Sequence, residues 1–156
     1  MNKSEHVLNK LLVQLFNELL EIEHDALKNG PFSDLSITEI HTIEAIGMYT
    51  PRTMSEVASD LKITVGTLTT AVNKLIKKEY VTRERIEEDR RVVMIRLTKK
   101  GKLAYRVHEK FHSDMIKETI KGIDDKEEEI LISSLEKLSA YFTYRYHLSN
   151  TATENK

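Results

Sequence analysis

The sequence contains no cysteine among its 156 residues, which excludes disulfides, thiolate metal sites and cysteine nucleophiles. It also lacks an apolar run near the ~18 residues that a membrane-spanning helix needs, and its first residues lack the apolar core of a signal peptide. A glycine-rich phosphate loop is absent too, and the candidate serine, histidine and aspartate residues fall on surfaces or helix caps, so we do not expect an enzyme. These absences predict a cytoplasmic protein that does not associate with membranes.

Charge is unevenly distributed along the chain, although the formal net charge is only -1. Residues 62–106 contain 13 lysines and arginines and 5 acidic residues, whereas the rest of the chain contains 11 basic and 20 acidic residues. A basic segment inside an acidic protein is typical of a chain that binds a polyanion through that segment. A solvated charged face is the alternative explanation.

Long amphipathic segments at both ends of the chain predict helices that need a partner. From residue 8 onwards, apolar residues recur at spacings of three and four, and the stripe ends before Gly30 and Pro31. A long helix is expected from Thr98 to about Lys121, and another follows a capping box that begins at Asp124. The stripe residues are Leu8, Leu12, Leu15, Leu19 and Ile22 in the first helix, and Leu131, Leu135, Leu138 and Phe142 in the last.

The middle of the chain predicts three shorter helices and a hairpin. The segments 36–46, 53–61 and 64–78 each open with a serine or threonine N-cap, and the first two carry glutamate three residues later. The last two of these helices are joined by a short turn, which is typical of a helix-turn-helix. Two β-rich runs, 81–85 and 92–97, flank a charged loop and predict a hairpin wing.

We therefore expect a mainly α fold with a small β-hairpin wing, in which a winged helix-turn-helix is joined to terminal helices that form a dimerisation domain. The predicted organisation has a dimerisation helix at 1–30 that packs with 122–148, and a DNA-binding domain at 31–100. Long connecting and dimerisation helices occupy 101–148, and a flexible tail occupies 149–156.

The outer face of the 64–78 helix suits the major groove of DNA. If Leu68, Val72 and Leu75 face the core, a rotation of 100° per residue leaves small and polar residues outside. Asn73 can pair bidentately with adenine, and Gly66 permits close approach of the backbone. Threonines are poor helix formers, so their concentration here favours a role beyond stability over a merely solvated surface. The predicted reading residues are Thr64, Gly66, Thr67, Thr69, Thr70, Asn73, Lys74 and Lys77.

The predicted wing places two arginines directly after an aspartate. Asp89 can orient one guanidinium while the other, from Arg90 or Arg91, enters a narrow minor groove. Solvent-exposed charge is the alternative for such a loop taken alone. Lys99 at the start of the following helix, with its neighbours Lys100 and Lys102, is expected to approach phosphates and add affinity without sequence choice.

Several segments together resemble the MarR family of winged-helix regulators over nearly the whole chain. They are Glu56-Val57-Ala58, Thr64 to Leu75, Tyr80-Val81, Glu88-Asp89-Arg90-Arg91 and Leu97-Thr98-Lys99-Lys100-Gly101. The resemblance implies a homodimer built from the terminal helices. It also implies recognition helices that enter successive major grooves of palindromic double-stranded DNA, with half-sites roughly 34–36 Å apart.

Within that family, segments 35–43, 89–93 and 108–112 resemble the branch that represses bacterial type II fatty acid synthesis genes. The resemblance implies a long-chain acyl group on acyl carrier protein as corepressor, and no resident metal or cofactor. An acyl chain needs an apolar tunnel. The residues expected to line it, which are otherwise ordinary core residues, are Phe16, Leu19, Ile40, His41, Ile43, Val107, His108, Phe111 and Met115.

Two alternatives remain. His108 and His112 stand four residues apart on one helix and, with His41 and either Glu23 or His24, match the donor types of a zinc site. This constellation also resembles the metal-sensing branch of the family, although the histidine-rich run associated with that branch is missing. The other alternative is an adaptor that uses its winged helix to contact proteins.

Overall fold

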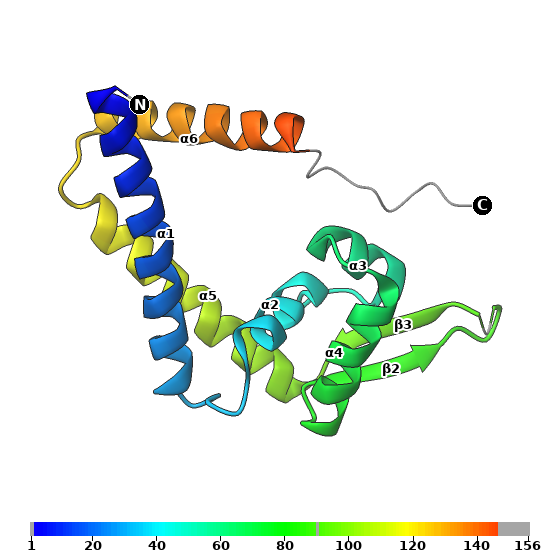
Figure 1. Cartoon of the computed structure of the whole chain (residues 1–156). Coiled ribbons are helices and arrows are strands. Elements are labelled where there is room, and N and C mark those ends of the chain that lie inside the picture. Colours follow the sequence, from blue (N-terminus) through cyan, green and yellow to red (C-terminus); the bar gives the residue numbers. More distant parts are fainter. Residues whose placement is uncertain (1, 90, 147–156) are drawn as a thin grey trace.

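The computed structural model describes residues 2–89 and 91–146 of the chain. It confirms the mainly α fold with a small wing (Figure 1). In chain order the elements are α1 (Lys3–Lys28), α2 (Ile37–Ile46), β1 (Arg52–Thr53), α3 (Met54–Leu61), α4 (Val65–Lys77), β2 (Val81–Arg85), β3 (Val93–Leu97), α5 (Lys99–Ile120) and α6 (Asp125–Arg145).

The helices begin where the capping signals predicted. Ser36, Thr53 and Asp124 each accept a hydrogen bond from the backbone N–H three residues on, and the glutamate at that position reaches back to the cap. Thr64 and Thr98 cap α4 and α5 through their hydroxyls without a glutamate partner. Satisfying these otherwise unpaired N–H groups fixes the start of each helix.

The wing is a β2–β3 hairpin, and it carries a third strand that the sequence did not predict. The two-residue strand β1 pairs antiparallel with β3, so that the strand order is β1-β3-β2. Thr53 therefore serves twice, because it pairs with Met94 across the sheet and also caps α3. This arrangement ties the start of the helix-turn-helix to the root of the wing.

The hydrophobic core lies inside the winged helix-turn-helix, between α2, α3, α4, the sheet and the first turns of α5. Its apolar side chains come from every one of these elements, and the hairpin projects beyond them into solvent (Figure 1). Burial of this apolar surface is what holds the recognition helix and the wing in fixed relative positions. The fully buried members include Ile43, Ile46, Val57, Leu68, Val72, Leu75, Tyr80 and Ile95.

A partly buried polar junction joins the end of α4 to the turn before α2 and to Glu39 in its first turn. The Tyr80 hydroxyl donates to Asp34 Oδ1 at 2.7 Å, and Lys78 Nζ donates to Glu39 Oε2 at 2.7 Å. Burial and the neighbouring carboxylates raise the pKa of Tyr80, so it remains a donor. Gly101 completes the junction, because a Cβ there would collide with the Tyr80 carbonyl oxygen.

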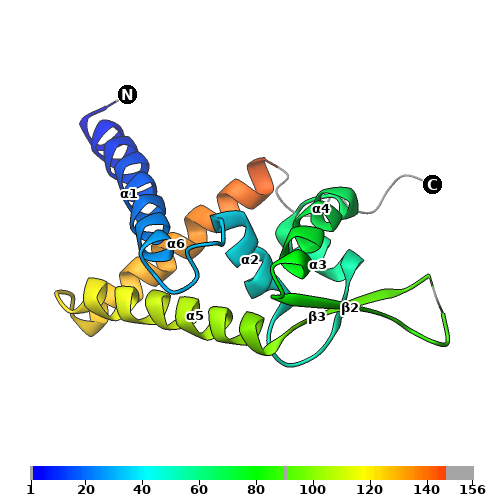
Figure 2. The ribbon, with the colours of Figure 1, turned by 90° about the horizontal axis from the view of Figure 1, so that it is seen from below.

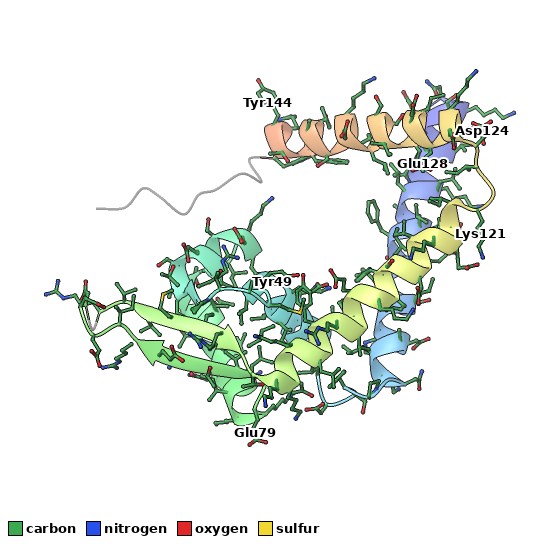
Figure 3. The ribbon with its side chains drawn as sticks, turned by 180° about the vertical axis from the view of Figure 1, so that it is seen from behind. Tyr49, Glu79, Lys121, Asp124, Glu128 and Tyr144 are labelled. Atoms are coloured by element: carbon green, nitrogen blue, oxygen red, sulfur yellow. The ribbon has the colours of Figure 1, made fainter. Side chains whose placement is uncertain are left out.

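The terminal helices contrast with this core, because their apolar stripes face solvent in the single chain. No residue of α6 is buried, and the one buried residue of α1 is Glu23. Figures 1 and 2 show α6 turning back from the end of α5 toward the side of the winged domain, and Figure 1 shows it lying apart from that domain. In Figure 3 its start at Asp124 lies beside α1, and Tyr144 at its far end stands in open space. Leu8, Leu15 and Leu135 are each half exposed or more. Within the described ranges, no helix combines the length and hydropathy that crossing a bilayer demands.

Candidate DNA-binding surface and effector cluster

The exposed face of α4 carries the side chains that the sequence assigned to base reading. Leu68, Val72 and Leu75 are buried against the core, so the opposite side of the helix is free. Thr69 is half-buried beside the wing. The other predicted reading residues are exposed, namely Thr64, Gly66, Thr67, Thr70, Asn73, Lys74 and Lys77. Their contact with bases remains a prediction.

Two threonine hydroxyls of α4 donate hydrogen bonds to the backbone of their own helix. Thr69 Oγ1 donates to the Val65 carbonyl at 2.8 Å, and Thr70 Oγ1 makes a longer bond of 3.4 Å to the Gly66 carbonyl. A hydroxyl that donates to its own backbone keeps its oxygen lone pairs. In this arrangement the threonines offer acceptors and methyl groups, which suit the amino groups of adenine and cytosine and the methyl of thymine.

Gly66 is not required by the packing of the protein. A Cβ at this position would meet only the Thr64 hydroxyl, at an ordinary van der Waals distance of 3.9 Å. Glycine in the first turn of a helix costs stability relative to alanine. A close external approach, such as that of a DNA strand, therefore remains the better explanation of this glycine.

Asn73 is engaged by a residue that the sequence did not single out. Arg83 of β2 donates from Nη2 to Asn73 Oδ1 at 2.9 Å. The predicted bidentate pairing of Asn73 with adenine needs this same oxygen as an acceptor. In the structure one of the two lone pairs of that oxygen is already used by Arg83, so a base meets the amide NH₂ and one remaining acceptor site.

At the tip of the wing, Asp89 Oδ1 accepts the backbone N–H of Arg91 at 3.0 Å and so shapes the turn. This short-range bond is favoured because the N–H lies two residues on in the same turn. The orientation of a guanidinium by Asp89 stays a prediction. Arg91 itself is exposed, and Arg90 lies outside the described residues.

A hollow of about 410 Å³ separates α4 from the wing. Its polar lining comes from the start of α3, from α4 and from both strands of the hairpin. Two of its lining residues are arginines, which favour an anion at this place. The side chains around it include those of Thr53, Ser55, Val65, Thr69, Arg83 and Arg91.

The three lysines at the start of α5 have different surroundings. Lys99 is exposed, and it keeps its predicted role at phosphates as a prediction. Lys100 Nζ instead donates to the Lys78 carbonyl at 2.9 Å and lies over the Tyr80 ring, 4.2 Å from the ring centre. Lys102 is half-buried beside the loop that contains Tyr49.

An apolar cavity lies where the predicted acyl pocket was expected, although it is small. It has a volume of about 40 Å³ between the end of α1, α2 and α5. Four of the predicted lining residues surround it, namely Ile40, Val107, His108 and Phe111. The others lie elsewhere: Phe16 is exposed, Leu19 and Met115 are half-buried, Ile43 is in the core, and His41 belongs to the cluster described next.

Next to this cavity, three imidazoles converge on one buried carboxylate. Oε1 of Glu23 lies 2.7 Å from His41 Nε2, 3.0 Å from His108 Nε2 and 3.4 Å from His112 Nε2. Glu44 Oε1 lies 3.5 Å from His108 Nε2 on the other side. The helices α1, α2 and α5 thus meet at this histidine–glutamate cluster.

The electrostatics of the cluster favour an ionised Glu23 and a neutral His108. Burial alone would raise the pKa of Glu23, but the hydrogen bond from His41 and the charges of the three histidines outweigh it and lower that pKa. Burial, assisted by His112, lowers the pKa of His108. Burial also raises the pKa of Glu44. A carboxylate beside imidazole nitrogens is a suitable set of ligands for a divalent metal, because metal binding displaces the protons of the imidazoles.

The sequence left open whether Glu23 or His24 joins the histidines, and the structure selects Glu23. His24 is exposed and lies outside the cluster. The sequence missed two site residues, Glu44 in the cluster and Arg83 beside the recognition helix. Glu44 is three residues after His41 on one helix, a spacing that places both on the same face. Arg83 lies two residues after buried Val81 on β2, so both side chains leave the strand on the same face. An arginine on the inward face of a strand was the signal that could have identified it.

Comparisons with known proteins agree with this geometry. The sequence pattern of the MarR family matches residues 35–93. Streptococcus pneumoniae FabT, solved in complex with DNA, is 40% identical and superposes with a TM-score of 0.84, and the match covers 88% of this chain and 96% of that one. The Bacillus subtilis transcriptional regulator PchR is 24% identical over 90% of this chain and 81% of its own length. The S. aureus MepR–DNA complex, at 19% identity and a TM-score of 0.71, covers 85% of this chain and 96% of that one and shares the fold.

MarR-family regulators bind DNA, typically as dimers, and they are not enzymes. The likeness to FabT extends over the winged domain and the terminal helices alike, at an identity that a shared fold alone does not require. The chain belongs to the MarR family of DNA-binding transcription regulators.

Proposed function

We propose that this protein is a dimeric repressor of type II fatty acid synthesis genes, with long-chain acyl-acyl carrier protein as its corepressor. The observation that carries the proposal is the 40% identity to FabT over 96% of that chain. The segments 35–43, 89–93 and 108–112, whose sequence resembles the fatty acid branch, support it. Segments 35–43 and 108–112 contribute residues to the cavity and to the histidine–glutamate cluster, and segment 89–93 belongs to the wing.

A homodimer follows from the unpaired apolar faces of α1 and α6. These faces hold half-exposed leucines at helical spacing, and a monomer gains nothing by presenting them to water. Pairing of the two copies about a two-fold axis buries the same stripe on both. Two α4 helices then reach successive major grooves of a palindrome, with half-sites roughly 34–36 Å apart.

The corepressor requires the cavity to widen. Its volume of about 40 Å³ is far below the roughly 300–1,000 Å³ of ordinary ligand sites. An acyl chain therefore enters only as the end of α1 moves away from α5. Phe111 stacks on His108 with ring centres 6.0 Å apart, so the chain must also displace this pair.

The test is the affinity of the protein for a fatty acid synthesis promoter with acyl-loaded carrier protein and with unloaded carrier protein. We expect the acyl-loaded form alone to tighten DNA binding. Phe111→Trp fills the cavity and should abolish that response, whereas Tyr49→Trp, at a side chain that is 89% exposed, should not. Equal affinity with loaded and unloaded carrier would refute the corepressor.

A zinc-responsive regulator is the second candidate, and the histidine–glutamate cluster favours it. In a tetrahedral zinc site with bonds of ~2.0–2.1 Å, the ligand atoms lie ~3.3 Å apart. The separations of 2.7 to 3.4 Å between Glu23 Oε1 and the three Nε2 atoms come close to this value. Nε2 of His108 and of His112 also face each other at 3.0 Å, as two ligands of one ion do. The potential ligand atoms form two sets of three that share His108, namely Glu23, His41 and His108, and Glu44, His108 and His112. A small side-chain movement would bring Glu23, His41, His108 and His112 around one ion.

Zinc content and DNA affinity together test this candidate. We expect about one zinc per chain after dialysis and tighter operator binding with zinc than with chelator. His112→Gln should lose both, and His24→Gln, next to Glu23 but outside the cluster, should keep both. Because His108 lines the cavity as well as the cluster, the promoter assay with acyl carrier is run with and without zinc. If acyl-loaded carrier tightens DNA binding equally with and without zinc, the zinc candidate is eliminated.

A further inference from the structure

One side-chain hydrogen bond joins the recognition helix to the wing. Arg83 donates from Nη2 to Asn73 Oδ1 at 2.9 Å, and both side chains are exposed on the predicted DNA-reading side. Arg83 pairs across the sheet with Ile95, which is completely buried. Since cross-strand partners share a face, Arg83 leaves the strand on the side of α4 and spans the gap to it.

Arg83 has no acidic partner among the described residues, unlike Arg96 on the neighbouring strand. The adjacent Glu84 points to the opposite face and pairs with Arg96 at 3.4 Å. A guanidinium has five N–H donors, of which Asn73 accepts one. The remaining donors border the hollow of about 410 Å³ between α4 and the wing. An exposed arginine held by an amide, with no carboxylate to neutralise it, is available to DNA.

The bond restricts what Asn73 can read. An asparagine recognises adenine by accepting from N6 through its oxygen while it donates to N7 through its NH₂. In the structure one of the two lone pairs of Oδ1 accepts from Arg83. The guanidinium beside that oxygen disfavours the approach of a second donor such as adenine N6, so the pair of side chains presents mainly donors. Donors match base edges that present acceptors, which are guanine O6 and N7 and thymine O4.

We propose that Arg83 is a positioning residue that sets the base preference of the recognition helix. It holds the amide of Asn73 so that the two side chains form one donor surface, which selects guanine or thymine and disfavours adenine at the position that Asn73 meets. In the free protein this exposed bond contributes little stability. When DNA excludes water from it, the bond strengthens and the orientation becomes decisive. The proposal rests on α4 entering the major groove.

The test compares Arg83→Met with Arg85→Met, a control that removes the same charge from the same face of β2. Each protein is selected against a randomised duplex library, and affinities are then measured for the selected operator and its single-base variants. We expect Arg83→Met to admit adenine at one symmetry-related position, changing the preference there by about tenfold. Arg85→Met should weaken binding to all sequences and leave the preference unchanged.

Two further variants guard the interpretation. Asn73→Asp keeps an acceptor for Arg83 but removes the NH₂ donors, so it should lose discrimination at that same position. Arg83→Lys, which keeps a positively charged donor group, should retain part of the discrimination. A uniform loss of affinity for Arg83→Met, equal to that of Arg85→Met, would show a phosphate contact only and overturn the proposal. A wild-type selection without sequence preference would overturn reading by α4 as well.

Discussion

The winged domain and the terminal helices bury their apolar residues in opposite ways. In the winged domain, leucine, isoleucine and valine side chains from α2, α3, α4 and the sheet reach zero exposure. In α6 no side chain is buried, and α1 buries only Glu23. The winged domain is therefore stabilised within one chain, whereas in the proposed homodimer the terminal helices gain their stability from a second copy. The experiments below separate these two sources.

The largest effect is expected in the core of the winged domain. Ile43 is completely buried, so Ile43→Ala should remove about 2–5 kcal/mol from the free energy of unfolding. The loss should be the same at low and high protein concentration, because the cavity forms within one chain. Urea unfolding at two concentrations measures it. A loss that shrinks at high concentration would place Ile43 in the dimer interface instead.

A comparable change in α6 should act through association. Leu135 is 50% exposed in the single chain, and Leu135→Asp introduces a charge into the proposed interface. We expect the dimer dissociation constant to rise by about hundredfold with the fold of each chain retained. Analytical ultracentrifugation reports the constant. Lys126→Asp is the control, since a carboxylate in the first turn of a helix is favourable; an equal effect of both would disprove the interface.

Gly66→Ala should have opposite effects on stability and on DNA binding. Because a Cβ fits there, alanine should stabilise the protein by about 0.5–1 kcal/mol. If a DNA strand approaches the backbone of α4, operator affinity should fall several-fold in the same variant. Thermal unfolding and operator titration check the two signs. Gly122→Ala also has free space and lies between α5 and α6, so it should leave DNA affinity unchanged; unchanged affinity for Gly66→Ala would remove the proposed close approach.

The smallest effect concerns the pH dependence of stability in the presence of a chelator. The folded protein holds His108 with a lowered pKa, whereas the unfolded chain takes up that proton near the ordinary value of 6.5. Stability should therefore fall as pH decreases below 6.5, and fall further below 4.5 as the lowered pKa of Glu23 is reached. Urea unfolding across this range measures both parts. His108→Gln should flatten the upper part; an unchanged curve would show that His108 is not held neutral.

The elements of the fold that depend on neighbours in sequence were predictable. Ser36, Thr53 and Asp124 begin helices because the glutamate that completes each cap is only three residues away. The strand β1 was missed, since two residues carry no alternation to detect and its pairing with β3 is decided by the folded chain.

The candidate sites could be predicted by residue type but not by arrangement. Adjacent residues on a helix point 100° apart, so only the packing of α1 on α2 decided that Glu23, rather than His24, meets His41. The bond between Arg83 and Asn73 likewise depends on how the wing lies beside α4. Contacts between long side chains of different elements leave no periodic pattern in the sequence, although the residue types that make them can be read from it.

The polar junction at Tyr80 links the recognition helix to the segment that carries His41 of the histidine–glutamate cluster. Through Asp34 and Glu39 it joins the far end of α4 to the stretch of chain that continues into Ile40 and His41. If the proposed effector shifts that stretch, the recognition helix should tilt with it, because packed elements move together. In a two-fold dimer both α4 helices would tilt together, so the distance between them would change by twice the displacement in each subunit.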